Sequence, residues 1–287
     1  MTLREFYEKA AQKGVRGVAS SAAFRVNHQK DRLKDRLVKE VTHWTQGLLS
    51  PWRERQVAML HVGRSGSSVL AHCLNQHPQI CWGGEIFKRY ENDPYDPLDV
   101  LETERLRAGR RYFGFEVKPY HLHKTSHSLA GYIEALRHHS VEHFVLLRRK
   151  NLLRKLVSSM IADKHTYHLS KDEKTKRVQV HVDTNKVEAH WQDRPLLRQI
   201  NKHVDEYETV RRNIEGDHAL HLTYEDDIYE SPLRAYRRVV DFLGLERREA
   251  QVKLRKVNPF PLRELIANFE EVEDHLKGTE HEWMLYA

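Results

Sequence analysis

The stretch from residue 57 to residue 87 constrains the fold most, because it joins an apolar segment to a turn of small residues and then to a helix. Residues 57–62, VAMLHV, have the length and branching of a buried strand. The turn Gly63-Arg64-Ser65-Gly66 follows, and Ser67 and Ser68 stand where the next helix should begin. Unpaired N–H groups and the helix dipole favour an anion at such a place. The stretch therefore predicts a site for phosphate or sulfate.

This turn departs from the Walker A pattern, GxxxxGK[ST], because its second glycine comes two positions early and no lysine precedes the hydroxyls. A P-loop kinase or NTPase is therefore the weaker alternative. The sequence Arg64-Ser65-Gly66-Ser67-Ser68 instead resembles the KSGTT of PKSGTTW, the 5′-phosphosulfate loop of sulfotransferases that use 3′-phosphoadenosine 5′-phosphosulfate (PAPS). The resemblance implies that Arg64, Ser65, Gly66, Ser67 and Ser68 bind the donor, and that Arg64 stabilises the leaving phosphate.

The order of elements predicts an α/β fold with a P-loop-like parallel sheet and helices on both faces, since apolar strands alternate with helices over crossover-length links. The 287 residues suit one large domain with an extension. We expect a helical N-terminal extension over 1–52 and a sulfotransferase domain over 53–287, in which the Lys-rich segment 163–202 is a substrate-facing insertion. Further strands are expected at 79–82, 112–118, 141–147 and 219–226, an edge strand at 178–182, and helices around Trp191 and over 262–276.

A formal net charge of +7 predicts an acidic partner, which could be nucleic acid, a membrane surface or a phosphorylated nucleotide. The sequence has no RNA-binding signature or zinc-finger spacing, so we expect no nucleic acid and no metal, although a basic polyanion-binding protein stays an alternative. Two cysteines, no signal peptide and no long apolar span favour a soluble, cytoplasmic protein without stable membrane insertion.

A second cationic segment, residues 147–158 (LRRKNLLRKLVS), predicts a site for another phosphate, since it joins a strand end to a helix start. The segment resembles the 3′-phosphate segment of the same superfamily, in which Arg ends a strand and Ser follows on the next helix. Ser158 matches that serine, and it lies about two helical turns after Asn151. For the arginine, Arg149 is the first choice and Arg148 the second.

Two further places resemble parts of this superfamily, and the second of them resembles its bacterial carbohydrate and glycolipid branch. Residues 222–226, LTYED, are similar to a strand end whose tyrosine lies near the adenine, which implies that role for Tyr224. Residues 256–259, with the segments around 268–272 and 278–280, are similar to the C-terminal part that closes over the nucleotide, and Lys256 is carried over from it.

Two residues are candidates for the general base. Glu85, in Gly-Gly-Glu-Ile-Phe after the second expected strand, resembles the glutamate of the bacterial branch. His121 resembles the histidine in the KTHLP motif of cytosolic sulfotransferases, shifted by one position. We favour Glu85 and keep His121 as the second choice. The resemblance implies transfer of the sulfuryl group of PAPS to a hydroxyl of a carbohydrate, lipid or small metabolite, with release of PAP and without a metal. It leaves homo-oligomerisation open.

Overall fold

The structure, a computed structural model, describes residues 55–88, 96–122, 125, 127–164, 169–170, 177–189, 192–256 and 258–287. The expected helical extension over 1–52 lies outside the described residues, and so does Trp191. None of the described helices is long and apolar enough to cross a membrane.

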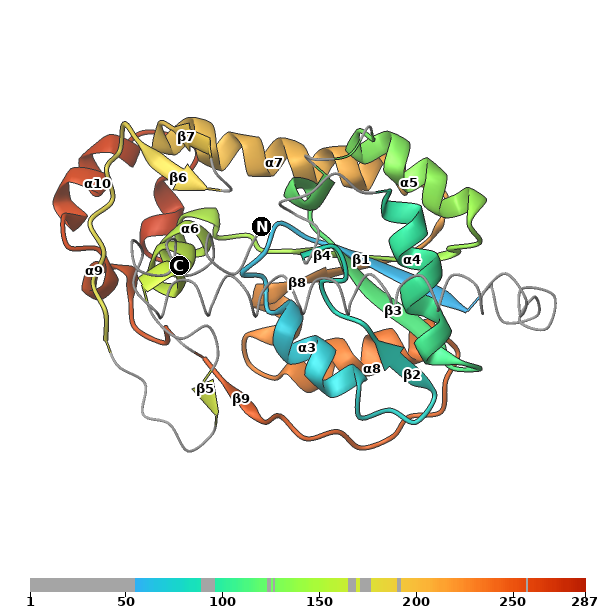
Figure 1. Cartoon of the computed structure of the whole chain (residues 1–287). Helices are drawn as coiled ribbons and strands as arrows, with labels where there is room; N and C mark the ends of the chain where they lie inside the picture. The colour runs from blue at the N-terminus through green and yellow to red at the C-terminus, as the bar shows by residue number, and fades with distance from the viewer. Residues whose placement is uncertain are drawn as a thin grey trace, which may run out of the picture. The chain divides into compact units, whose positions relative to one another are not determined.

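A five-stranded parallel sheet forms the centre of the described chain, in the order β2-β3-β1-β4-β8 (Figure 1). Leu60 in β1 pairs with Val117 in β3 on one side and with Leu146 in β4 on the other. The strands are β1 (Gln56–Leu60), β2 (Ile80–Trp82), β3 (Tyr112–Val117), β4 (His143–Arg148) and β8 (His218–Thr223). Because the chain adds strands first on one side of β1 and then on the other, the direction of winding changes at β1.

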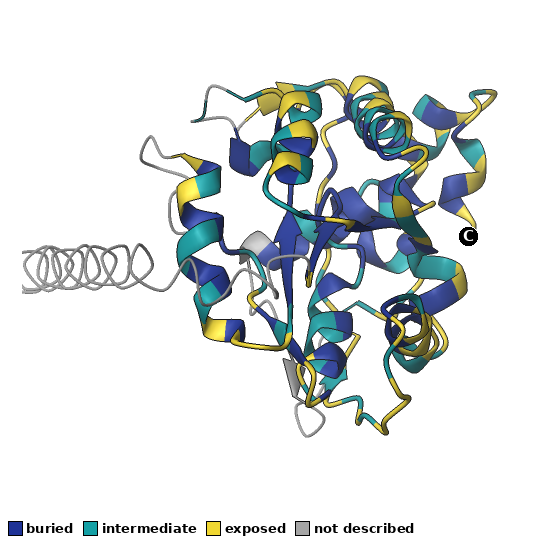
Figure 2. Cartoon of the chain, turned by 90° about the vertical axis from the view of Figure 1, so that its right-hand side faces the viewer, coloured by how far each residue is buried: buried dark blue, intermediate teal, exposed yellow. Residues whose placement is uncertain are grey.

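Helices cover both faces of this sheet, which confirms the predicted α/β fold (Figure 1). Side chains of β1 alternate between the two faces, since Val57 and Met59 belong to one apolar cluster while Ala58 and Leu60 belong to the other. The first cluster also holds α3 (Ser67–Leu74) and α8 (Pro232–Phe242); the second holds α4 (Pro97–Arg105), α5 (Leu129–His138), α6 (Leu152–Lys164) and α7 (Leu196–Asn213). The strands β1, β3 and β4 are almost wholly buried, and Figure 2 shows exposed residues on the outer sides of the helices.

Shorter elements complete the described chain. Two small antiparallel pairs join β5 (Leu169–Ser170) to β9 (Leu254–Arg255) and β6 (Val187–Ala189) to β7 (Gln192–Arg194). The remaining elements are the 3-10 turns Leu106–Ala108, Pro119–Leu122 and Glu282–Leu285, the π-helical turn η5 (Tyr224–Ile228), and the helices α9 (Leu262–Leu265) and α10 (Phe269–Leu276).

The expected edge strand over 178–182 and the continuous helix over 262–276 are both wrong, and one contact explains why. Val180 forms an isolated bridge with Ile266, where Val180 N–H donates to Leu265 O and Ala267 N–H donates to Val180 O. Ile266 is extended at φ −101° and ψ 118°, so the helix stops and a second helix starts beyond it. Hydrophobic periodicity cannot reveal such a break, because Ile266 is buried in either conformation.

Two other expected elements end differently. The strand expected over 219–226 stops at Thr223, because the Thr223 side chain accepts the N–H of Asp226 and starts the π-helical turn η5. In the segment for which a helix was expected around Trp191, residues 192–194 form β7 instead, and the long helix α7 begins only at Leu196, directly after Pro195.

Candidate functional site

The candidate site lies at the carboxyl edge of the sheet, where each of the five strands delivers one side chain. Arg64 follows β1, Glu85 follows β2, Lys118 follows β3, Arg149 follows β4 and Tyr224 follows β8. All five residues line one cavity of about 760 Å³. In open α/β sheets ligands bind at this edge, beside the strand where the winding changes, and the volume is within the range of about 300–1,000 Å³ typical of small-molecule sites.

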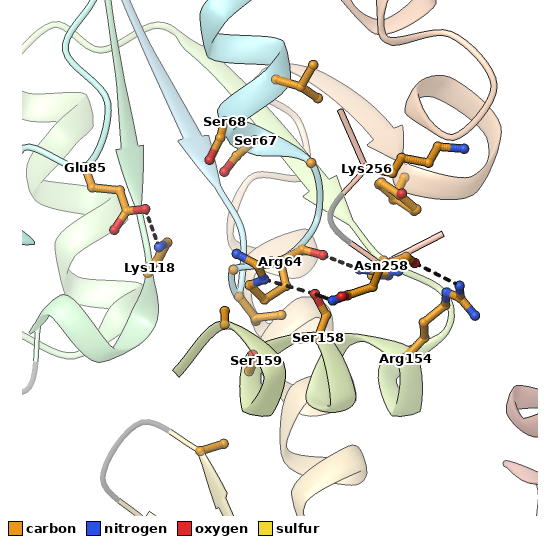
Figure 3. Close-up of a pocket in the computed structure, with 18 of the residues that line it drawn as sticks. Arg64, Ser67, Ser68, Glu85, Lys118, Arg154, Ser158, Ser159, Lys256 and Asn258 are labelled. Atoms are coloured by element: carbon orange, nitrogen blue, oxygen red, sulfur yellow. Dashed lines mark hydrogen bonds and ion pairs between the residues drawn. The ribbon is translucent and has the colours of Figure 1, made fainter. Parts of the chain in front are cut away.

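The cavity is strongly cationic (Figure 3). Its charged lining consists of Arg64, Lys88, Lys118, Arg149, Arg154, Arg255 and Lys256, against the two carboxylates of Glu85 and Glu188. Hydroxyl and amide groups from Ser67, Ser68, Ser158, Ser159, Tyr120, Tyr224 and Asn258 line it as well. Such a lining suits a ligand with several negative charges and hydrogen-bond acceptors.

The loop between β1 and α3 is held in a conformation that requires small residues. Gly63 and Gly66 have φ of 82° and 85°, and Arg64 adopts φ 53°, which is uncommon for a residue with a side chain. A Cβ on Gly66 would lie 2.9 Å from Ile228 Cγ2 and 3.0 Å from Tyr224 Cδ2. Glycine is therefore needed at 66 both for backbone conformation and for the close approach of η5.

The hydroxyl of Ser65 points away from the cavity, unlike those of Ser67 and Ser68. Ser65 is fully buried, and its Oγ donates to Gly63 O at 3.1 Å and lies 3.2 Å from the hydroxyl oxygen of Tyr207. Ser65 therefore stabilises the loop through contacts on the side that faces away from the cavity. Ser67 and Ser68, which open α3, line the cavity and remain available to a ligand.

Side chains from the two predicted phosphate segments meet in this cavity. Arg64 Nε donates to Ser158 Oγ at 3.1 Å, and Arg149 donates through a terminal nitrogen to Arg64 O at 2.6 Å (Figure 3). The guanidinium of Arg149 stacks 4.3 Å from the ring centre of Tyr224 and is only 7% exposed. Its Nε has no hydrogen-bond partner among the described residues. A buried guanidinium with a free N–H fits an anion oxygen.

Arg148, the second choice for this arginine, lies outside the cavity lining. Its side chain is 38% exposed, lies 3.7 Å from a carboxylate oxygen of Glu208 and stacks over the ring of Tyr207. The two neighbouring arginines point in different directions because they stand at the end of β4, where successive side chains alternate.

The start of α6 differs from the sequence interpretation, in which its N–H groups contribute to phosphate binding. The carboxylate of Glu225 accepts the N–H of Lys150 at 2.9 Å and the N–H of Asn151 at 3.1 Å. Asn151 Oδ1 accepts the N–H of Arg154 at 2.8 Å. These backbone donors are therefore occupied by protein groups, and this segment faces the cavity with side chains, among them those of Arg149, Arg154 and Ser158.

Residues 254–256 and Asn258, in the C-terminal part of the chain, form another wall of the cavity. Arg154 donates to Asn258 O at 3.2 Å and to Phe260 O at 2.6 Å, which fastens this segment to α6. Lys256 lines the cavity and places its ammonium 3.4 Å from the ring centre of Tyr229. The predicted Lys256 thus joins the other predicted residues, while Asn258 and Arg154 were given no role by the sequence interpretation.

Glu85 is paired at the opposite side of the cavity. Lys118 Nζ lies 2.5 Å from Glu85 Oε1 (Figure 3). His121 Nε2 lies 3.6 Å from Glu85 Oε2. Burial alone would raise the pKa of Glu85, but nearby His121 and Lys118 outweigh it and hold that pKa well below its usual range. His121 is fully buried and absent from the lining, and burial lowers its pKa. Of the two candidate bases, only Glu85 reaches the cavity.

A buried network fixes the strand ends behind this pair. His61 Nδ1 accepts the N–H of Gly63 at 3.1 Å, so Nε2 carries the proton and donates to Glu116 Oε2 at 2.9 Å. Trp82 Nε1 donates to the other Glu116 oxygen at 3.2 Å. The ends of β1, β2 and β3 are thereby tied together at the point where the loop begins.

Lys118 and Tyr207 are important residues that the sequence interpretation missed. Lys118 is the first cation after β3, and its position at a strand end on the ligand edge of a parallel sheet could have identified it. Tyr207 comes from α7, and nothing in the local sequence indicates that its hydroxyl reaches Ser65 and Arg149.

No protein-family model matches the sequence, and no curated protein matches it. Among solved structures, the chain is similar to a crystal structure described as a sulfotransferase from Alicyclobacillus acidocaldarius, with 15% sequence identity and a TM-score of 0.46. The similarity covers 80% of this chain and 93% of that chain.

Proposed function

We propose that this chain is a sulfotransferase, which transfers the sulfuryl group of PAPS to an acceptor hydroxyl and releases PAP. The observation that carries the proposal is the meeting of Arg64 with Ser158 and Arg149 in one cationic cavity. A donor with phosphates at its 5′ and 3′ positions needs two neighbouring anion sites. The β1–α3 loop and the α6 segment supply two such groups of residues.

The loop is proposed to hold the 5′ end of the donor. Ser67 and Ser68 offer hydroxyls at the start of α3, and Arg64 adds a permanent charge. Charge grows on the phosphate oxygen as the sulfuryl group leaves, and a cation already placed there lowers the barrier. Arg64 is assigned this role, with Lys118 as a second cation across the cavity.

The α6 segment is proposed to hold the 3′-phosphate. Arg149 has a buried Nε without a partner among the described residues, which is the orphaned donor that a phosphate oxygen would satisfy. Ser158 and Arg154 stand on the same helix face, and Lys256 reaches the cavity from the C-terminal segment. Tyr224, whose ring stacks on Arg149, is proposed to border the adenine.

Glu85 is proposed as the group that accepts the proton of the acceptor hydroxyl. The S–O bond to the 5′-phosphate breaks while a new S–O bond forms to the acceptor oxygen, and the acceptor proton passes to the Glu85 carboxylate. While paired with Lys118, this carboxylate is ionised but weakly basic, because its pKa is low. An anion that attracts Lys118 away from Glu85 would raise the basicity of Glu85, so donor binding and base activation are proposed to be linked.

The acceptor is proposed to be a carbohydrate, lipid or small metabolite. Glu188 and Ala189 of β6 line the cavity, so the 163–202 segment contributes part of its wall. That contribution supports the proposal that this segment contacts the acceptor. We also propose a cytoplasmic location for the protein. Whether it forms a homo-oligomer stays an open question.

Calorimetric binding of PAP to the full chain tests the donor assignment. Wild-type protein is expected to bind PAP and to gain thermal stability from it, because a ligand of the folded state raises the melting temperature. Arg149→Met should weaken binding by about 100-fold or more, since a charged hydrogen bond and a buried cation are lost together. Arg148→Met is the matched control and should change affinity less than about threefold, because Arg148 lies outside the cavity. Absence of PAP binding, or equal losses in both variants, would refute the assignment.

A further inference from the structure

A buried lysine lies next to the cavity without lining it. Lys155 stands on α6 three residues before Ser158, and its side chain is 0% exposed. Its Nζ lies 2.9 Å from His203 Nε2 on α7. Lysine is almost never fully buried without a specific partner, because a buried ammonium loses its hydration. The proposed reaction assigns no role to this amine.

The bond between Lys155 and His203 can persist whether or not the lysine is charged. His203 Nδ1 lies 2.9 Å from Glu206 Oε2, and an ionised carboxylate can only accept, so Nδ1 carries the proton of the imidazole. The lone pair of Nε2 therefore faces Lys155. Both an ammonium and a neutral amine can donate an N–H to that lone pair, so Lys155 can gain or lose a proton without breaking the contact.

The charges around Lys155 link it to the cavity. On α7, Glu206 favours the ammonium, while Lys202, which lies 3.0 Å from Glu206, opposes it. Lys118 after β3 and Arg64 in the loop also oppose it, and both of these line the cavity. Burial lowers the pKa of Lys155 most. Burial and the three cations outweigh Glu206 and bring this pKa to about 7.

The same helix connects Lys155 mechanically to both phosphate segments. Tyr207 stands one turn after His203 on α7. Its hydroxyl oxygen accepts the N–H of Arg149 at 3.1 Å and lies 3.2 Å from Ser65 Oγ. A change in the contact between Lys155 and His203 therefore alters the packing of α6 against α7. That packing sets the position of Ser158 on α6 and, through Tyr207, the position of the β1–α3 loop.

We propose that Lys155 is a positioning residue which takes up a proton from solvent when an anion fills the cavity, with His203 as its acceptor and Glu206 holding His203 in the tautomer that accepts. The anion neutralises Arg64 and Lys118, so the energetic cost of a third positive charge falls. The resulting ammonium binds His203 more strongly and tightens α6 against α7 around the ligand. This proposal rests on the proposed function only for the choice of PAP as the anion.

Lysine side chains in the full-length protein can be titrated by NMR after ¹³C labelling. One lysine resonance is expected to titrate near pH 7, and Lys155→Met, or Lys155→Arg if the first variant does not fold, should remove it. Without any ligand, Lys118→Met should move this midpoint upward by about half a pH unit or more, because a nearby positive charge is lost. Saturating PAP should also move it upward. Lys277→Met, which removes an exposed lysine on another element, should leave the midpoint unchanged.

Binding of PAP should show the same linkage. In wild-type protein the affinity should fall as the pH rises from 7 to 9, by up to about tenfold for each unit by which binding raises the midpoint. In Lys155→Met this decrease should be absent. A Lys155 resonance that titrates near pH 10, or a midpoint unmoved by bound PAP, would overturn the proposal. If PAP does not bind but Lys118→Met still shifts the midpoint, the charge coupling stands and the donor assignment fails.

Discussion

Arg64 Nε donates to Ser158 Oγ at 3.1 Å, although 94 residues separate the two in the chain. Arg64 belongs to the loop after β1, and Ser158 to the second turn of the helix after β4. β1 and β4 are neighbours in the sheet, so their carboxyl ends bring the loop and the helix to one cavity. This contact is the geometric condition for one bisphosphorylated nucleotide to be bound by both segments.

Replacement of Ser158 by alanine should weaken PAP binding by about tenfold or more, because a hydrogen bond to a charged group contributes about 1.5–3 kcal/mol. The hydroxyl of Ser158 accepts from Arg64 and faces the cavity, so it can donate to a phosphate oxygen. Calorimetric titration with PAP measures the change.

Ser159→Ala provides the matched control for that variant. Ser159 lines the cavity as well, but its hydroxyl already donates within α6 to Lys155 O at 3.3 Å, so its loss should change PAP affinity less than about twofold. A larger effect at Ser159 than at Ser158 would contradict the assignment of the 3′-phosphate to Ser158.

Glu85→Gln should change the stability of the protein in a pH-dependent way. The folded-state pKa of Glu85 is lowered, so its ionised form stabilises the folded state above the unfolded pKa of about 4.3. That stabilisation is lost progressively as the pH falls toward the lowered pKa. Wild type should therefore exceed Glu85→Gln in urea resistance at pH 7, and the difference should shrink at pH 3. A constant difference across this range would show that Glu85 and Lys118 are not an effective ion pair.

Glu225→Ala should destabilise the protein by about 1–2 kcal/mol, because two N–H groups at the start of α6 lose their acceptor. Glu225→Gln keeps one acceptor oxygen and should cost less. The neighbouring Asp226→Asn serves as a comparison, since Asp226 is exposed and bonds to the Lys150 side chain instead of the helix backbone. Urea unfolding of the three variants measures the order, and an equal loss at 225 and 226 would contradict the capping role.

Much of the fold follows from the sequence because strands of a parallel sheet are buried on both faces and therefore read as apolar runs. Val57 to Leu60 and Phe144 to Leu147 are such runs, and both are central strands. The break at Ile266 could not be predicted, because it depends on pairing with Val180, 86 positions earlier in the chain by residue number. Contacts of this kind leave no local periodicity.

The candidate site was predictable in part, for a related reason. Arg64, Arg149 and Glu85 follow strands, and the carboxyl ends of parallel strands meet at one edge. The orientation of each side chain could not be predicted from the sequence. Arg148 and Arg149 are alike in sequence, and only the alternation at the end of β4 sends one into the cavity. Glu225 likewise looked like part of a ligand motif, but the structure uses it to cap α6.

The hydroxyl of Tyr207 contacts both Ser65 and Arg149 from helix α7, which begins at Leu196, inside the 163–202 segment. An α-helix turns by about 100° per residue. Insertion of a single residue early in α7 would therefore rotate Tyr207 about a quarter-turn off the loop, whereas insertions before Pro195 would leave its rotational phase intact. Changes in chain length upstream of Pro195 are therefore compatible with the contacts of Tyr207 to Ser65 and Arg149, whereas a one-residue change inside α7 breaks them.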